Sequence, residues 1–298
     1  MMETQASLQR KLNGATDLKS VVKSMKAMAA ANIGQYELAV SSLGDYYRAV
    51  SLGIIAYFRQ EKIDIITEQN SLKGNKEKSI YAIVFGSDQG LVGQFNDSLS
   101  EFVSQSLKDL SGKKEIWAVG ERVQLLLLDM GYTTSQLFPV PNSVNAITPL
   151  VQQILVNSEE IFDNRNVTEV YIFHNKPNSR AGYEPAMHRL LPLDEKWRQS
   201  LTELKWPTKL IPQVIGGVKP TLSALIHTYL FTTLFKACAE SLASENASRL
   251  TAMQRAEKNI DELLDDLTHK FHSLRQSSID EELFDVVSGY EMLSKKHS

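Results

Sequence analysis

A short polar loop with three glycines is the first candidate for chemistry in this sequence. Gly86-Ser87-Asp88-Gln89-Gly90-Leu91-Val92-Gly93 follows an apolar run and precedes a helical pattern. Backbone N–H groups at such a turn can bind phosphate. However, the loop lacks the Lys-Ser/Thr pair of a P-loop, its glycines do not fit GxGxxG, and Asp88 would repel phosphate. The sequence therefore favours a structural turn over a nucleotide site.

Six histidines and one cysteine are the other candidates for catalysis or metal binding. His269 and His272 are three residues apart in a helical pattern, but no carboxylate or third ligand stands at a fitting spacing. Cys238 is the single cysteine, so no intrachain disulfide can form and a helix-packing role is expected. No nucleophile elbow or Cys-His pairing accompanies them. We predict no catalytic residue, no metal site and no cofactor.

Positive charge gathers near the N-terminus. The basic residues there are Arg10, Lys11, Lys19, Lys23 and Lys26, opposed only by Glu3 and Asp17. One interpretation is a solvated helix face. The other is docking to an acidic protein surface, because complementary charge speeds and orients association. Aromatic residues that could stack on bases are not interleaved here, so nucleic acid is not an expected partner.

The last quarter of the chain is predicted to form one very long helix. No proline or glycine lies between Pro220 and Gly289, and the composition favours helix, so an unbroken helix would span about 100 Å. Apolar residues recur every seven positions at Met253, Ile260, Leu267 and Leu274. This spacing predicts a narrow apolar seam that needs a partner helix.

The partner is predicted at the other end of the chain, from about residue 4 to residue 60. Its seven-residue series is Leu8, Ala15, Val22, Ala29, Tyr36, Leu43, Val50 and Tyr57, and a second row three residues later contains Leu18, Met25, Ala39 and Tyr46. Four glycines interrupt this segment, each costing about 1 kcal/mol relative to alanine. We therefore expect the two ends of the chain to pair as antiparallel helices.

The middle of the chain has a different pattern. Short apolar runs at 80–85, 116–119 and 170–173 alternate with helical patterns at about 93–110, 121–130 and 145–162, and 187–193 could add an edge strand. This alternation is typical of a parallel sheet with crossover helices. The predicted fold class is α/β, a long antiparallel two-helix coiled coil with a central Rossmann-like domain. The predicted segments are helix 1–62, linker 63–79, α/β domain 80–215, helix 216–293 and polar tail 294–298.

Bulk composition limits the function classes. The chain has 298 residues, 43% hydrophobic residues and a formal net charge of −3, which exerts no strong field on nucleic acid. No run reaches the roughly 18 apolar residues of a membrane span, and the polar N-terminus lacks a signal-peptide core. Any membrane association is expected to come through partners.

Three sequence blocks resemble the gamma subunit of ATP synthase, the central-stalk rotor of the F-type enzyme. The blocks are Lys23-Ser-Met-Lys-Ala-Met-Ala-Ala-Ala31, Ser87-Asp-Gln-Gly-Leu-Val-Gly-Gln-Phe-Asn96, and Ser241-Leu-Ala-Ser-Glu-Asn-Ala-Ser-Arg-Leu-Thr-Ala-Met253 continuing to Gly289. They stand in the family's order and span nearly the whole chain. Residues 175–219 match only loosely.

This resemblance implies a non-catalytic rotor, one copy per complex, coupling H⁺ or Na⁺ flow to ATP synthesis or hydrolysis. Its implied partners are the alpha and beta subunits, the epsilon subunit and the c-ring, and its implied location is the cytoplasmic face of the plasma membrane. By the same resemblance, contacts to the beta subunit fall on Lys23, Met25, Lys26, Arg249, Arg275 and Gln276. The apical bearing falls on Ile279, Leu283, Phe284, Val286 and Val287.

Several features depart from the family pattern. Residues 13–17 are less basic than usual, and the polar tail after Gly289 is longer than a small-residue ending. We interpret the chain as a divergent bacterial or archaeal member. Two alternatives from other classes are a coiled-coil scaffold with an α/β adaptor domain, and an α/β enzyme with a helical arm that uses the loop 86–93.

Overall fold

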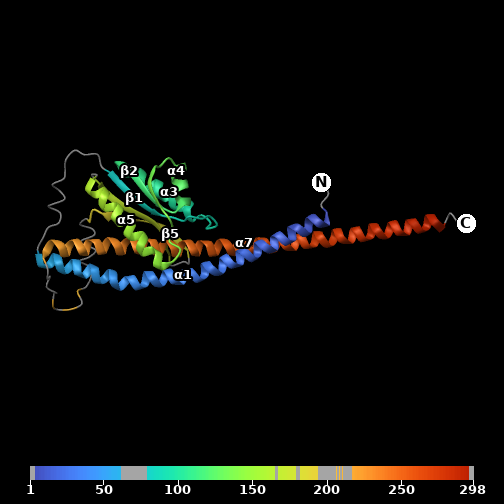
Figure 1. Cartoon of the computed structure of the whole chain (residues 1–298), viewed down its shortest axis with the longest axis horizontal. Helices are drawn as coiled ribbons and strands as arrows, with labels where there is room; N and C mark the ends of the chain where they lie inside the picture. Colours follow the sequence, from blue (N-terminus) through green and yellow to red (C-terminus); the bar gives the residue numbers. More distant parts are fainter. Residues whose placement is uncertain are drawn as a thin grey trace. The chain divides into compact units, whose positions relative to one another are not determined.

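The computed structural model describes residues 4–61, 79–164, 167–178, 182–193, 206, 208, 210 and 217–294 (Figure 1). The chain divides into two compact units, Met1–Met28 with Leu250–Ser298, and Ala29–Arg249. The long helices α1 (Gln5–Glu61) and α7 (Val218–Ser294) contribute residues to both units. Apart from Ser79 and Ser294, the predicted linker and polar tail lie outside the described residues.

The unit Ala29–Arg249 is built on a five-stranded sheet with the order β3-β2-β1-β4-β5. Its parallel strands are β1 (Ser79–Phe85), β2 (Lys113–Val119), β3 (Thr134–Phe138) and β4 (Val167–Pro177). The edge strand β5 (Tyr183–Leu191) pairs antiparallel with β4. The helices α3 (Phe95–Lys108), α4 (Glu121–Asp129) and α5 (Val144–Asn164) connect the parallel strands. The predicted Rossmann-like fold with a mainly parallel sheet is confirmed.

Strand β3 was not predicted from the sequence. Its five residues, Thr134–Phe138, include three polar ones, and only Phe138 is buried. An edge strand of this length shows too little alternation to distinguish it from a loop. This segment is a strand because its backbone pairs with β2, and its own sequence does not indicate that pairing.

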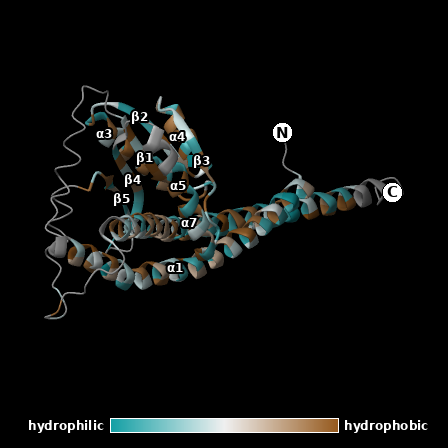
Figure 2. Ribbon diagram, turned by 60° about the vertical axis from the view of Figure 1, so that its left-hand side comes forward, coloured by the Kyte–Doolittle hydropathy of each residue, from teal (hydrophilic) through white to brown (hydrophobic). Residues whose placement is uncertain are grey.

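The two faces of the sheet have separate cores because successive side chains of a strand point to opposite faces. On β1, Tyr81, Ile83 and Phe85 pack with α5 and α7, and the residues between them pack with α3 and α4. The central strands are accordingly mostly hydrophobic in Figure 2. The result is a three-layer α/β/α arrangement in this unit, as Figure 1 shows.

Within the unit of the two chain ends, α1 and α7 run antiparallel. Lys19 pairs with Asp261 and Lys26 with Glu257, so a step forward on α1 corresponds to a step back on α7. A small apolar cluster of Leu8, Ala15 and Leu267 accompanies these ion pairs. The predicted pairing of the chain ends is confirmed in this unit.

The same two helices also pair within the unit Ala29–Arg249. Tyr47 on α1 and Tyr229 on α7 place their ring centroids 5.7 Å apart, beside the buried Ile54. One 18-residue window of α7 is apolar enough by composition to cross a membrane, with a mean hydropathy of 1.2. A third of this window, 33%, is buried, and buried α7 residues such as Leu234 and Leu242 belong to the core of the sheet unit.

The predicted heptad series of α1 holds, whereas its second row holds only in part, because Met25 and Ala39 are half-buried and the other two members are exposed. The series members Leu8, Ala15, Ala29, Tyr36, Val50 and Tyr57 are buried. Leu18 and Tyr46, expected in the second row, are 59% and 51% exposed. The seam is completed instead by positions four residues after each member, including Lys19 and Lys26. The tertiary position of α7 decides which flank is covered, and both flanks fit a helical period.

Candidate functional site

The loop after β1 is held at the N-terminus of α4 by one carboxylate. Asp88 Oδ1 accepts a hydrogen bond from Glu121 N at 3.0 Å, and Asp88 Oδ2 accepts one from Val140 N at 3.0 Å. The first amide of α4 is among those that an external anion would need. Asp88 therefore caps the N-terminus of α4, whereas the phosphate site weighed from the sequence would lie at the start of α3.

Close backbone packing surrounds this loop. A Cβ on Gly120 would lie 2.7 Å from the carbonyl carbon and oxygen of Ser87, and Gly120 has a φ of 114°. Ser87 N donates to Asn96 Oδ1 at 3.0 Å, and Asn96 Nδ2 donates back to Ser87 Oγ at 2.8 Å. Both side chains are buried. These contacts give the loop the structural role that the sequence favoured.

Three serines of α7 dock this helix onto the C-terminal edge of the sheet. Ser241 Oγ donates to Phe85 O at 2.9 Å, and Ser244 Oγ lies 3.1 Å from Asn175 O. Ser248 Oγ donates to Val92 O. The three serines recur at i, i+3 and i+7, which places them on one face of the helix.

This docking fills the crevice where an open α/β sheet usually binds ligands. That crevice lies outside the carboxyl ends of the strands, where the strand order reverses. In this sheet the reversal falls between β1 and β4, because β2 and β4 flank β1 on opposite sides. Ser241 and Ser244 bond to these strands' C-terminal residues, so the chain's own helix occupies the position of a ligand.

A buried ion pair lies on α7 within the same block. Arg249 Nη2 is 2.6 Å from Glu245 Oε1. Burial raises the pKa of Glu245, and the charge and hydrogen bond of Arg249 act against that shift. Burial also raises the pKa of nearby Tyr36 on α1. Glu245 was not singled out from the sequence, although it stands four residues before Arg249.

A second polar contact joins β4 to α7. His174 Nε2 donates to Glu240 Oε2 at 2.8 Å, and Lys236 lies 3.8 Å from the other carboxylate oxygen of Glu240. Burial by itself would raise the pKa of Glu240. The hydrogen bond and positive charge of His174, with further positive charge from Lys236, lower the pKa overall. The carboxylate therefore stays ionised between the imidazole of His174 and the ammonium group of Lys236.

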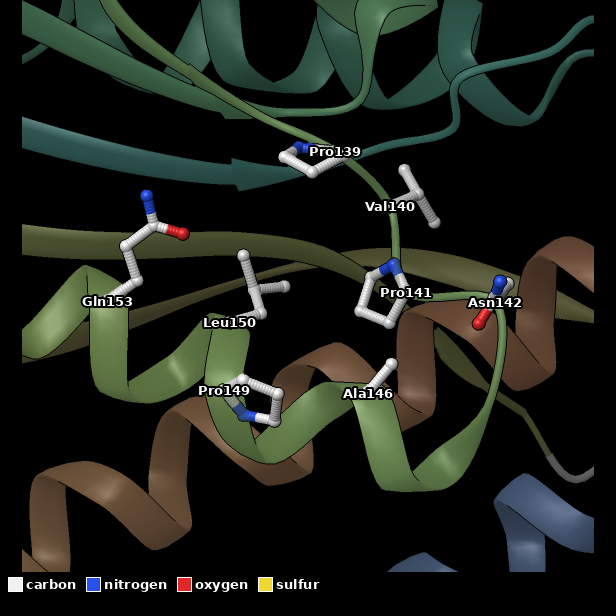
Figure 3. A pocket seen from close by; sticks show the side chains of 8 residues that line it. All are labelled: Pro139, Val140, Pro141, Asn142, Ala146, Pro149, Leu150 and Gln153. Atoms are coloured by element: carbon white, nitrogen blue, oxygen red, sulfur yellow. The ribbon is translucent and has the colours of Figure 1, made fainter.

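A shallow hollow lies between the loop after β3 and the start of α5 (Figure 3). Its volume is about 300 Å³. The lining residues are Pro139, Val140, Pro141, Asn142, Ala146, Pro149, Leu150 and Gln153. None of these eight side chains carries a charge, so the hollow does not suit a nucleotide phosphate. Among the described residues, no group of three or more His, Cys, Asp or Glu side chains could hold a metal ion.

Comparison with known proteins places this architecture. The sequence profile described as ATP synthase matches residues 4–293. The chain belongs to the ATP synthase family. The gamma chain of ATP synthase from Clostridium botulinum strain Kyoto is 24% identical over 286 residues, covering 95% of this chain and 96% of the relative. The gamma chain from Arthrobacter sp. strain FB24 is 24% identical over 301 residues, covering 96% of each.

Solved ATP synthase structures share the fold of this family member. A chain of the Euglena gracilis mitochondrial ATP synthase, in the structure of OSCP, F1 and c-ring, aligns with a TM-score of 0.63 and 18% identity, covering 97% of this chain and 94% of that one. A central stalk and c-ring structure from Tetrahymena thermophila gives a TM-score of 0.52 at 18% identity, covering 79% and 99%. The resemblance to gamma subunits, and the non-catalytic role that it implied, are confirmed.

The contact residues implied by the family resemblance differ in their surroundings. Lys23, Arg275 and Gln276 are exposed, and Met25 is half-buried. Lys26 and Arg249 each pair with a carboxylate of α7. The exposed residues are free to face another subunit, whereas the two paired cations already neutralise charge within this chain.

The residues assigned to the apical bearing form an exposed apolar end of α7. Their exposed fractions are 51% for Ile279, 63% for Leu283, 71% for Phe284, 72% for Val286 and 48% for Val287. Four of the five, all except Phe284, follow the i, i+4, i+7, i+8 spacing of one helical stripe. This stripe is apolar surface that the described part of the chain leaves uncovered.

The sequence reasoning missed the polar residues that organise the sheet edge. In the sequence alone, Asp88 indicates only repulsion of phosphate, and the serines of α7 stand out only as part of a family block. The spacing of Ser241, Ser244 and Ser248 is visible in the sequence as a row of hydroxyl groups at i, i+3 and i+7. Their acceptors lie 156, 69 and 156 residues away in the chain, which no local pattern indicates.

Proposed function

We propose that this chain is the central rotor of a complete F-type ATP synthase, one copy per complex. Its partners are an alpha and beta subunit hexamer, the epsilon subunit and the c-ring, and its place is the cytoplasmic face of the plasma membrane. Family membership over residues 4–293 supports the rotor role. The translocated ion, H⁺ or Na⁺, is a property of other subunits.

The observation that carries the proposal is the exposed apolar end of α7. Exposed apolar patches on soluble proteins mark interaction sites, because burying them in a partner removes apolar area from water. An apolar sleeve around Leu283 and Phe284 would allow rotation, since single dispersion contacts contribute only about 0.1–0.2 kcal/mol and have no fixed direction. A partner that bound this end of α7 by directional hydrogen bonds would resist each step of rotation.

The proposed contacts to the beta subunit lie on the flanks of the paired helices. Lys23 and Met25 come from α1, and Arg275 and Gln276 come from α7. Lys26 and Arg249 complete the proposed set, with Glu257 and Glu245 as their partners inside the chain. Because different faces of a turning helix pair meet each beta subunit in sequence, such contacts can favour different beta conformations in turn.

Purification through a tag on this chain tests the assembly. We expect an alpha and beta hexamer, epsilon and a c-ring to co-purify with it. Replacing Leu283 and Phe284 by Gln is expected to slow ATP-driven rotation. The matched control replaces Glu281 and Glu282, exposed residues of the same turn, by Gln.

Two results would count against the proposal. Recovery of the tagged chain alone, or as a dimer of itself, would favour the scaffold alternative. Equal rotation rates in the Leu283/Phe284 variant and the control would remove the bearing assignment and leave the rotor assignment standing.

A further inference from the structure

Two serines of α7, Ser241 and Ser248, differ from three threonines of that helix in where their hydroxyl groups donate. Thr228, Thr232 and Thr268 donate to carbonyls one turn earlier in their own helix. Ser241 and Ser248 instead donate to carbonyls of β1 and of the loop that follows it. Both serines are buried, so water does not compete for these acceptors.

The third serine makes the same connection more weakly. Ser244 Oγ lies 3.1 Å from Asn175 O on β4 and 2.8 Å from Glu240 O in its own helix. Its single hydrogen is shared between these acceptors. Asn175 is itself tied in, because its Nδ2 donates to Phe95 O at 3.0 Å. Ser241 and Ser248 are therefore the stronger links between α7 and the sheet.

The hydrogen bonds of Ser241 and Ser248 restrict sliding and turning of α7 against the sheet more than apolar packing does. Leu242 and Ala243 bury apolar surface against the sheet unit, and apolar contact is largely non-directional. Hydrogen bonds weaken steeply when the donor–hydrogen–acceptor angle falls below about 120°. Two such bonds, separated by seven residues on one helix face, oppose both sliding of α7 along its axis and turning about it.

We propose that Ser241 and Ser248 are positioning residues that hold α7 in register with the sheet while the rotor is under load, with Ser244 in support. The inference rests on the proposed rotor function. Torque that passes between the sheet and α7 must cross their interface, and these bonds are directional contacts there, together with the one between His174 and Glu240. Without them, the helix can slip against the sheet before the load is transmitted.

The test uses the assembled enzyme in vesicles, with Ser241 and Ser248 both replaced by Ala. Loss of two net hydrogen bonds should raise the population of slipped states on the order of tenfold. We therefore expect fewer ions pumped per ATP hydrolysed as the opposing gradient increases. Hydrolysis by the enzyme without a gradient should stay at the wild-type rate, because no load then acts on the interface.

Two further variants separate register from simple stability. Thr232→Val removes a buried hydroxyl whose acceptors, Thr228 O and Tyr229 O, lie in its own helix. It should pump normally against the same gradient. Ser241→Cys replaces the hydroxyl by a somewhat larger thiol that is only a weak donor, and it should fall between wild type and Ser241→Ala.

Several outcomes would overturn the inference. Wild-type pumping by the double variant under load would show that the serines only stabilise the fold, and so would an equal defect in Thr232→Val. If the double variant does not assemble, Ser241→Ala and Ser248→Ala are tested singly, and each should show a smaller loss of ions pumped per ATP. Normal pumping by both single variants would refute the inference. Failure of the wild-type chain to co-purify with the hexamer and c-ring would instead remove the rotor function itself.

Discussion

Arg249 Nη2 lies 2.6 Å from Glu245 Oε1, one turn earlier on α7, and the two side chains are only 17% and 7% exposed. Arg249, a member of the proposed contact set, is therefore also engaged inside this chain by Glu245. A buried carboxylate that loses its cation keeps the cost of desolvation without the compensating attraction.

We predict that Arg249→Met lowers the free energy of unfolding by about 3 kcal/mol. The double variant Glu245→Gln/Arg249→Met should recover most of this loss, because no uncompensated charge remains. Urea denaturation of the purified chains measures both values. The loss should shrink as pH falls, since a carboxyl whose pKa is raised in the folded state costs stability only while it is ionised. A loss that is equal in the single and double variants would contradict this assignment.

The contact between His174 and Glu240 predicts a dependence of stability on pH. The pKa of Glu240 is lowered in the folded chain, so its contribution is fully present above the ordinary Glu pKa of about 4.3 and is lost as pH falls through the lower folded value. We expect Glu240→Gln to be less stable than wild type at neutral pH, with the difference disappearing in acid. A difference that grows toward low pH would refute the sign.

Asp88 is predicted to hold the loop 86–93 through its two carboxylate oxygens. Asp88→Ala leaves the amides of Glu121 and Val140 without this acceptor, at a cost of about 1–3 kcal/mol. Hydrogen exchange should accelerate at the amides of Glu121 and Val140 more than at the other amides of α4. Glu101→Gln, at an exposed position of α3, is the matched control and should leave both amides protected.

Replacing a glycine by alanine should raise the stability of this chain at some positions and lower it at others. A Cβ on Gly34 or Gly44 of α1 meets nothing within 4 Å, so each Gly→Ala change should stabilise the chain by about 0.5–1 kcal/mol. Gly120→Ala should be strongly destabilising, because the new Cβ would lie 2.7 Å from the Ser87 backbone at a φ of 114°. Thermal unfolding of the variants checks the sign of each change.

The proposed beta contacts are best tested at positions without an internal partner role. Arg275→Ala with Gln276→Ala should lower the number of ions pumped per ATP while leaving the unfolding midpoint of the chain unchanged, since both residues are exposed on α7. Arg255→Ala, another exposed cation of the same helix, is the control. Equal coupling in the variant and in wild type would remove Arg275 and Gln276 from the contact set.

Local regularities of the sequence determined the main elements of this protein. The seven-residue series that contains Leu8, Tyr36 and Tyr57 predicted α1 and its buried seam, because helical periodicity depends only on near neighbours in the chain. The apolar runs of β1, β2 and β4 identified the centre of the sheet for the same reason. The family followed from the sequence blocks themselves.

The tertiary structure alone decided which groups these elements bring together. A helical stripe can be completed on either flank, so only the packed α7 shows that Lys19 belongs to the seam and Leu18 does not. Ser241 and Phe85 are 156 residues apart, and a hydrogen bond over that separation depends on how the intervening sheet and helices pack. The helical period depends only on adjacent turns of one helix, whereas the acceptor that a side-chain donor meets depends on the whole fold.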